Sequence, residues 1–491
     1  MFRCYTSLMV VVGALWSSVV LADLAHGVSA GEVTESSAVI WSRYHKAATM
    51  IVTYTPATGV AEVREARIRN SADDDFTAQV TLTDLEPDTR YRYEVSFRSG
   101  GKRSTKVAGM FRTAPVPTAA TDVTLVFSGD LAGQRYCRRP DVGYQIFKPM
   151  AALQADFFVA NGDMIYADND CPENGIEPGW KNIPGDFPGV GNPSVDWHDD
   201  ETVAEVFNAH WRYNREDEHF AAFLATTPVY VQWDDHEVIN DFGAPWASYP
   251  PQPERTGFAN VVAAGRKSLF DYHPITRHPS EPDRIYRSFR WGKHVELFIL
   301  DARSYRSLNR EQDTDEKTML GAEQLAWIKD ALVTSDATWK IVSSDVPLSV
   351  PTGSQADQYG HDAFAGSDTV PGFETELAGL LKSLDAANVN NIVFIATDVH
   401  SAAQVRYSGD YDGDGDELSF HELIAGPLSA IRGRGIGVDP TFGPTKLYGE
   451  GGFFNFATVS VESGAGARLR ADVRDETGTI RPGSELVLEP M

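Results

Sequence analysis

The chain has 491 residues, 42% of them hydrophobic and 11% aromatic, so it can bury a sizeable core and is long enough for two or three domains. Acidic residues outnumber basic ones, 69 against 43, and the formal net charge is −26. This balance argues against binding nucleic acid through a broad basic surface. It does not exclude a phosphate substrate, because bound cations reverse the local sign of the charge.

Residues 1–22 have the features of a secretory signal peptide. Arg3 supplies a positive charge, and an apolar stretch from 8 to 21 leads to a cleavage sequence before Asp23. The alternative is a membrane anchor, but the stretch is short and interrupted by Gly13 and two serines, and no later stretch is apolar enough to span a bilayer. We therefore expect a secreted or periplasmic protein.

After cleavage the chain keeps two cysteines, Cys137 and Cys171. An oxidising compartment permits a disulfide between them, and we expect one. Both flank loops that we place beside a site, so the alternative is that one of them binds a metal.

Residues 23–115 alternate apolar and polar residues in short runs, at 37–44, 48–55, 78–85 and 91–97. The segment "LTDLEPDTRYRYEV" resembles the corner of a fibronectin-type sandwich, where a tyrosine beside the turn bonds back to the backbone. Tyr91 is the predicted corner tyrosine. A linker rich in Pro, Thr and Ala follows and ends near Thr121.

Residues 121–491 change to long apolar runs that alternate with helical patterns, as in a layered α/β domain. The runs predict strands buried on both faces, at 122–130, 155–163, 227–235, 295–303, 339–347 and 391–400. Helices are predicted at 144–155, 203–214, 321–333 and 374–388. The tail returns to β-like alternation from about 453, and 169–199 reads as a long loop beside a site.

Each predicted strand stops at polar residues: Asp130; Asp163 and Tyr166; Asp234, Asp235, His236 and Glu237; Asp301 and Arg303; Asp345; Asp398 and His400. In open α/β sheets ligands bind beyond the carboxyl ends of the strands. So many acids in one crevice need cations, and these side chains suit Ca²⁺, Mn²⁺, Zn²⁺ or iron. A single aspartate at a strand end is more often a helix cap, but the joint occurrence favours a metal site.

A second acidic run, "SGDYDGDGDELSF", has the spacing of the start of a calcium loop in Asp410, Asp412 and Asp414. The twelfth position holds His421 instead of glutamate, although Glu422 follows directly. The alternatives are a structural Ca²⁺ site and a solvated acidic turn.

Four segments, "NGDMIYAD", "WDDHEVIND", "LDARSYR" and "TDVHSA", resemble the signatures of PhoD-like alkaline phosphatases and phosphodiesterases, within the metallophosphoesterase superfamily. The resemblance covers nearly the whole mature chain. It implies an α/β fold class, with a fibronectin/Ig-like β-sandwich at 23–115 and a four-layer α/β/β/α catalytic domain at 121–491.

The resemblance also implies two metal ions, Fe³⁺ and Ca²⁺, with Zn²⁺ or Mn²⁺ as alternatives. Asp163 would bridge the ions, Tyr166 and His400 would bind the first, and Asp235 and Asp398 would bind the second.

By the same resemblance, His236 would donate a proton or contact phosphate, and Arg303 would hold phosphate or order the carboxylates. One departure concerns the first motif, which usually ends in a cysteine that binds iron. Here Asp130 takes that place and is the preferred ligand, with Cys137 as the alternative. Asp345 is a further candidate ligand.

These expectations predict a monomeric hydrolase in which a metal-activated hydroxide attacks a small phosphomonoester or phosphodiester. The alternatives are a phospholipase D-like phosphodiesterase, a secreted nuclease, and a non-catalytic, calcium-dependent binding protein.

Overall fold

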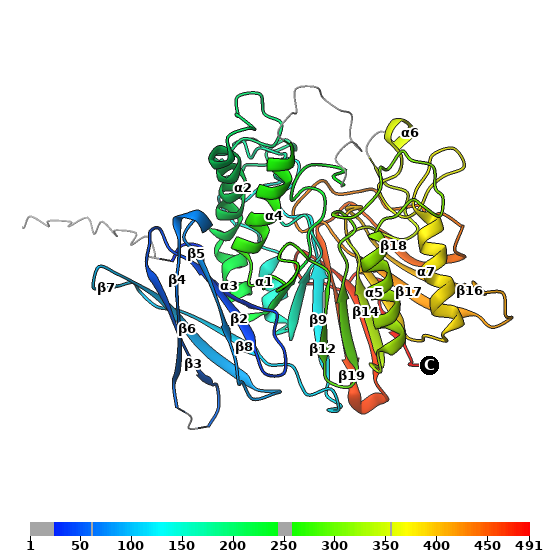
Figure 1. Cartoon of the computed structure of the whole chain (residues 1–491), viewed down its shortest axis with the longest axis horizontal. Coiled ribbons are helices and arrows are strands. Elements are labelled where there is room, and N and C mark those ends of the chain that lie inside the picture. Colours follow the sequence, from blue (N-terminus) through cyan, green and yellow to red (C-terminus); the bar gives the residue numbers. More distant parts are fainter. Residues whose placement is uncertain (1–23, 60–61, 244–257, 354–355) are drawn as a thin grey trace, which may run out of the picture.

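The computed structural model describes residues 24–59, 62–243, 258–353 and 356–491, in three sheets with helices packed against them (Figure 1). The predicted signal peptide, 1–22, lies outside the described residues. Within these ranges, each helix is too short or too polar to cross a membrane.

The N-terminal region is a β-sandwich. One of its layers contains β1 (Val28–Gly31), β2 (Ala38–Arg43) and β5 (Thr77–Leu82). The other contains β3 (Thr49–Pro56), β4 (Arg64–Arg69), β6 (Arg90–Ser99), β7 (Lys102–Arg103) and β8 (Val107–Arg112). Tyr91 and Tyr93 of β6 point into the core, and Arg92 between them is exposed. The backbone N–H of Glu86 donates to the Tyr91 hydroxyl at 2.9 Å, which confirms the predicted tyrosine corner.

The rest of the chain contributes two mixed sheets. The nine-stranded sheet has the order β21-β20-β19-β9-β10-β11-β1-β2-β5, and adds β9 (Val123–Ser128), β10 (Phe157–Ala160), β11 (Val229–Val231), β19 (Asn455–Glu462), β20 (Arg468–Asp475) and β21 (Leu486–Leu488). The seven-stranded sheet has the order β12-β13-β14-β15-β17-β16-β18. Its strands are β12 (Arg287–Trp291), β13 (Val295–Ile299), β14 (Trp339–Ser343), β15 (Ile392–Ala396), β16 (Ala402–Gly409), β17 (Leu418–Ile424) and β18 (Pro444–Glu450).

The six strands predicted for this domain are β9, β10 and β11 in the first sheet and β13, β14 and β15 in the second. Each set of three runs parallel. The carboxyl ends of each set therefore meet at one edge of their sheet, which is the arrangement that the polar strand ends require.

Helices cover the outer face of each sheet. Those on the nine-stranded side are α1 (Phe147–Ala152), α2 (Asp200–Arg215), α3 (Glu218–Thr226) and α4 (Phe258–Tyr272). On the other side are α5 (Gly321–Thr334) and α7 (Glu374–Ala386), and the short α6 (Ala356–Tyr359) lies near α7 in Figure 1. The predicted helices are α1, α2, α5 and α7. The sequence patterns did not predict α3 and α4, although Asp217 caps α3 by accepting the N–H groups of His219 and Phe220.

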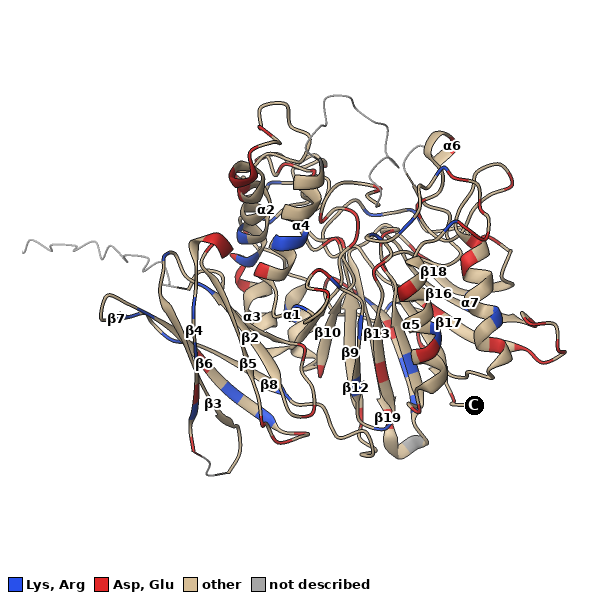
Figure 2. Cartoon of the chain, viewed as in Figure 1, with Lys and Arg blue, Asp and Glu red and all other residues tan. Residues whose placement is uncertain are grey.

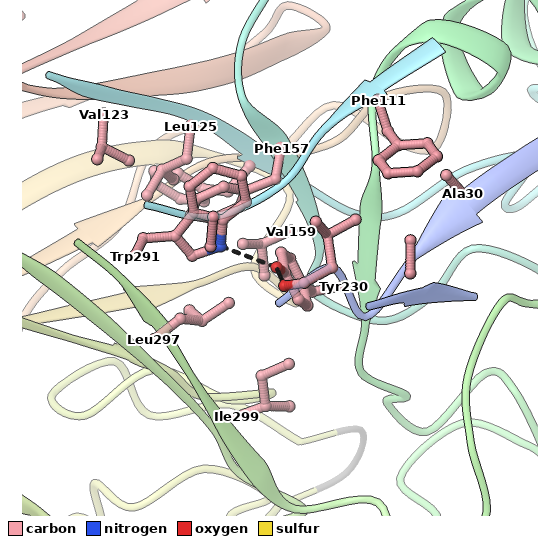
Figure 3. Close-up of a cluster of buried hydrophobic side chains, with 14 of the residues drawn as sticks. Ala30, Phe111, Val123, Leu125, Phe157, Val159, Tyr230, Trp291, Leu297 and Ile299 are labelled. Carbon is pink, nitrogen blue, oxygen red and sulfur yellow. Dashed lines mark hydrogen bonds between the residues drawn. The ribbon is translucent and has the colours of Figure 1, made fainter. Parts of the chain in front are cut away.

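The main core lies between the two sheets (Figure 3). Leu125 and Phe127 of β9 point into it, whereas Val126 between them packs under the helices, as expected for a strand buried on both faces. Trp291 Nε1 donates to the Tyr230 hydroxyl at 2.8 Å and joins the two sheets. The layers therefore follow the order helix, sheet, sheet, helix.

The sandwich shares a sheet with the α/β domain. Strand β1 pairs in parallel with β11, with Gly31 opposite Val229. A Cβ atom at Gly31 would lie 2.5 Å from the Val229 carbonyl oxygen, so this close approach needs glycine. The apolar core is also continuous from the sandwich into the space between the sheets. The predicted residue boundaries, 23–115 and 121–491, stay predictions.

Candidate metal centre

A cavity of about 770 Å³ opens beyond the carboxyl ends of β10, β11 and β15. Its charged or ionisable lining comes mainly from the segments that follow these strands (Asp163, Asp235, His236, Asp241, Asp398 and His400), and Asp439 adds one more carboxylate from the chain before β18. The described lining contains no lysine and no arginine. The cavity is therefore a crevice rich in carboxylates.

The four residues predicted to surround a first metal ion meet on one side of this crevice. Ligand atoms of Asp130, Asp163 and His400 all lie within 4.8 Å of one another. The Tyr166 hydroxyl is 2.8 Å from His400 Nε2. The set combines two carboxylates, a phenol and an imidazole.

The residues predicted for the second ion also converge. Ligand atoms of Asp235 and Asp398 form a group within 4.8 Å together with Asp234, which the sequence patterns did not single out as a ligand. A third group joins Asp163 to Asp235 and His236. Asp163 thus takes part in groups on both sides of the crevice, as a bridging ligand must.

Four of these residues have a left-handed backbone conformation (positive φ), which residues other than glycine rarely adopt. The φ angle is 59° at Asp130, 52° at Asp163, 68° at Asp398 and 52° at His400. Each such residue costs on the order of 1–3 kcal/mol, a strain that clusters at functional sites. Gly162 precedes Asp163 because a Cβ atom there would lie 2.5 Å from the Cβ of Asp234. The folded chain holds these side chains in place against a local cost.

Electrostatics make the crevice unfavourable without cations. Burial, reinforced by the neighbouring carboxylates, raises the pKa of Asp163, Asp234 and Asp398 well above the usual range. Burial also raises the pKa of Asp130 to about 8. Asp130 Oδ2 and Asp235 Oδ1 are buried without a hydrogen-bond partner among the described residues. Such orphaned oxygens and a donor set of carboxylate, phenol and imidazole fit hard or intermediate metal ions.

His236 is held by a partner that the sequence patterns missed. Its Nδ1 lies 2.7 Å from Asp168 Oδ1, and its ring stacks on Tyr166 with centroids 4.0 Å apart. Burial would lower the pKa of His236, but Asp168 and Asp235 raise it to about 9. Although burial opposes the effect, the imidazole lowers the pKa of Asp168. Asp168 ends the motif "NGDMIYAD", so its position within a signature was the available signal.

Glu237 orders the backbone beneath the crevice instead of entering it. Its carboxylate accepts the N–H groups of Asp163, Met164 and Asp234 at 2.7–2.8 Å. It therefore ties the end of β10 to the end of β11. Glu237 is thus a residue that supports the crevice and does not line it.

Arg303 is fully buried and contacts carboxylates. Its Nε donates to Asp234 at 2.5 Å, its Nη1 donates to Asp362 at 2.7 Å, and its Nη2 lies 3.8 Å from Asp398. Arg306 and Asn309 hold Asp362 in turn. Of the two roles predicted for Arg303, ordering the carboxylates is the one its contacts support. Asp362 had no signal in a recognised motif.

Two candidate ligands lie elsewhere. Cys137 is joined to Cys171 in a disulfide, so the alternative prediction of a Cys137 thiolate ligand is incompatible with the structure. Asp345 is buried but accepts hydrogen bonds from Gln232 and from the Ala302 N–H, and it belongs to none of the candidate metal groups. Asp130 is therefore the first-motif residue whose carboxylate groups with Asp163 and His400 of the crevice.

The second acidic run forms the turn between β16 and β17, which projects at the right of Figure 2. Asp410 and Asp412 come within 4.8 Å of Asp385 at the end of α7, a residue that the sequence patterns missed, and Asp414 is not in this group. Glu422 points into the core and accepts the Tyr407 hydroxyl at 2.6 Å, so it cannot close a calcium loop.

Comparison with known proteins agrees with these features. Residues 125–443 match the family model described as PhoD-like phosphatase, and residues 16–115 match the model of the PhoD-like phosphatase N-terminal domain. Alkaline phosphatase D of Bacillus subtilis (strain 168) is 26% identical over 384 residues, which are 74% of this chain and 59% of that protein. The chain thus spans less than two thirds of the length of this relative.

Two solved structures share the fold. One, titled "Structure of PhoD", has a TM-score of 0.73 at 19% identity and covers 95% of this chain and 89% of its own. The other, purple acid phosphatase PPD1 from yellow lupin (Lupinus luteus) seeds, has a TM-score of 0.57 at 12% identity, with coverages of 94% and 73%. At these identities the likeness concerns the fold alone: a β-sandwich followed by an α/β domain with two mixed sheets.

Proposed function

The chain belongs to the PhoD-like phosphatase family, and on that premise we propose that it is a metal-dependent hydrolase of phosphate esters. One observation carries the proposal. Buried carboxylates from distant strands converge with two histidines around one cavity, and one oxygen each of Asp130, Asp234 and Asp235 lacks a hydrogen-bond partner among the described residues. This is the arrangement that metal ions and a phosphoryl group would complete.

We propose that Asp163 bridges two ions, with the remaining ligands supplied by Asp130, Tyr166, Asp235, Asp398 and His400. Iron and calcium are the proposed pair, with zinc or manganese as alternatives. The ions would supply positive charge to the phosphoryl oxygens and activate a water molecule for attack.

The chain's own residues handle the leaving group. Because Asp168 accepts at His236 Nδ1, the opposite ring nitrogen, Nε2, is the one that can give a proton to the departing oxygen. Arg303 does not contact the substrate in this mechanism. It donates to Asp234 and so holds that carboxylate next to the proposed ligands. It is a positioning residue in this mechanism.

A specific observation favours a phosphodiester over a monoester. The described lining of the cavity offers no lysine or arginine. A diester carries one negative charge, whereas a monoester carries about −1.5 to −2 near neutral pH and needs more compensation. A phosphodiesterase of the phospholipase D-like kind is therefore the second candidate. A purely calcium-binding role leaves His236 and His400 in the cavity without a purpose.

We also propose export from the cytoplasm. The support is the signal-like segment at 1–22 and the disulfide between Cys137 and Cys171, a bond typical of oxidising compartments.

The test is elemental analysis of the purified mature protein, paired with hydrolysis of bis-p-nitrophenyl phosphate and p-nitrophenyl phosphate. We expect about two metals per chain, loss of turnover with a chelator, and a higher kcat/KM for the diester. Asp163→Asn should lose both metal and turnover. Full metal content without turnover of either ester would refute the proposal.

A further inference from the structure

A second cavity of about 610 Å³ lies beside the first. The two share Gln134 and Ile431 in their linings. Gln134 Oε1 accepts the Ile431 N–H at 3.2 Å, and the Gln134 N–H donates to Asn169 Oδ1 at 2.9 Å. A hydrogen-bonded ridge between these residues thus forms the boundary of the two cavities.

The second cavity adjoins the side of the crevice where His236 stands. Asp168 lines the second cavity and accepts from the ring of His236, which lines the first. In an in-line displacement the leaving oxygen departs opposite the attacking water. The ridge of Gln134 and Ile431, which both cavities share, is the border that a leaving alcohol larger than the first cavity would cross to enter the second.

A disulfide and several hydrogen bonds hold the wall of the second cavity in place. It belongs largely to the long loop 169–199, which the disulfide at Cys171 anchors to Cys137. Val190 donates its N–H to the Ala167 carbonyl at 2.7 Å. Asn182 donates to two carbonyls across the base of the loop. The disulfide and these hydrogen bonds therefore fix the shape of the second cavity next to the site.

We propose that this second cavity is the subsite for the leaving alcohol of the substrate, which is a neutral, hydroxylated alcohol of about the size of a sugar. The proposal rests on the proposed function. Amide and carboxylate side chains (Asn169, Asn192, Asp168 and Asp170) supply hydrogen-bonding groups, and none of the described residues that line the cavity is aromatic. An anionic alcohol would face Asp168 and Asp170, and the lining's single cation, Arg135, already lies 3.9 Å from Asp170.

The experiment narrows the second cavity from its exposed side. Ile176 lines it and is 51% exposed, so Ile176→Trp adds bulk without disturbing the core. Asp186→Trp places the same bulk at an exposed position of the loop outside the cavity and is the matched control. Melting temperatures verify that both variants fold.

Each variant is compared with the parent on the same substrate, so intrinsic reactivity cancels. The probes are glucose 1-phosphate and bis(glucos-6-yl) phosphate, whose leaving groups are sugars, and the mono- and bis-p-nitrophenyl esters. We expect Ile176→Trp to lower kcat/KM for the sugar esters at least tenfold and to leave the nitrophenyl esters within twofold. The control should change neither.

Three results would overturn the subsite: equal losses on both kinds of ester, no loss on either, or a parent that hydrolyses nitrophenyl esters but no sugar ester. A parent inactive on every ester refutes the proposed function itself, and the subsite with it. The failures of the two proposals are therefore distinguishable.

Discussion

The molecule contains two clusters of aspartates that the sequence presents in similar ways and the fold treats in opposite ways. In the crevice, Asp130 and Asp235 are buried and each has an oxygen without a hydrogen-bond partner among the described residues. In the turn between β16 and β17, Asp410 and Asp414 are exposed and Asp412 is half-buried. Asp410 there accepts the N–H groups of Gly413 and Gly415, and Asp412 accepts that of Asp414.

The difference shows what makes an acidic cluster into a metal site. The turn satisfies its carboxylates with its own backbone and with water, as short acidic turns commonly do. The crevice has strained backbone, buried carboxylates and raised pKa values, so its carboxylates need an outside cation. Spacing in the sequence, which fits a calcium loop only at the turn, is the weaker criterion.

The largest expected effect comes from breaking the crevice cluster. Asp163→Asn should lower kcat/KM for bis-p-nitrophenyl phosphate on the order of 10³-fold or more, because it removes the carboxylate that we propose as the ligand shared by two ions. Asp412→Asn makes the same chemical change in the turn between β16 and β17. Its kcat/KM for the same ester should stay within twofold of the parent value. Comparable losses in the two variants would remove the distinction between the clusters.

The next effect concerns the residue that holds His236. Asp168→Asn should lower kcat roughly 10- to 100-fold, because the imidazole loses its orientation. The loss should be greater for an alkyl ester than for a nitrophenyl ester, since a poor leaving group depends more on proton donation. Asp168→Glu should recover part of the activity. An equal loss on both esters with no recovery by Glu would indicate that Asp168 serves the fold alone.

Removing metal should also separate the clusters by stability. A chelator should lower the melting temperature of the parent by several degrees, because ions that bind only the folded state stabilise it. The double variant Asp410→Asn/Asp412→Asn should show the same shift, measured by calorimetry. If the double variant abolishes the shift, the turn holds the stabilising ion.

The smallest effect is expected at Glu422, a buried carboxylate near the turn whose described partners include no cationic group. Burial raises the pKa of Glu422 from 4.5 to about 7. The folded state therefore binds this proton more tightly than the unfolded state. Its contribution to stability is complete below about pH 4.5 and is lost as pH rises through 7. Over that interval the parent should lose up to about 3 kcal/mol relative to Glu422→Gln, as measured by urea unfolding at pH 5 and pH 8. Parallel pH profiles would contradict this prediction.

The segment "WDDHEVINDF" illustrates how far the sequence leads. Its run of acids after an apolar strand predicted a site, and the structure places Asp235 and His236 in the cavity. The division of labour among the acids came from distant partners: Asp234 accepts from Arg303, and Glu237 accepts from the backbone after β10. No pattern within ten residues encodes which carboxylate meets which partner.

The same limit applies to the fold. Apolar runs with polar ends identified the parallel strands, and 3.6-residue periodicity identified four helices, because burial and periodicity are local properties of the chain. The pairing of β1 with β11 joins residues about 200 positions apart, and the Asp168–His236 contact spans 68. Such contacts depend on loop closure and on the packing of whole layers.

The sequence by itself determined the types of element, the strand ends that carry carboxylates and histidines, and the order of the signature segments. Only the tertiary structure decided which of those carboxylates are buried with orphaned oxygens and which are satisfied by their own turn. It also decided that Cys137 is in a disulfide and that a second cavity adjoins the first. The physical reason is that desolvation and hydrogen-bond partnership are set by what packs around a side chain, and most of those neighbours are remote in sequence.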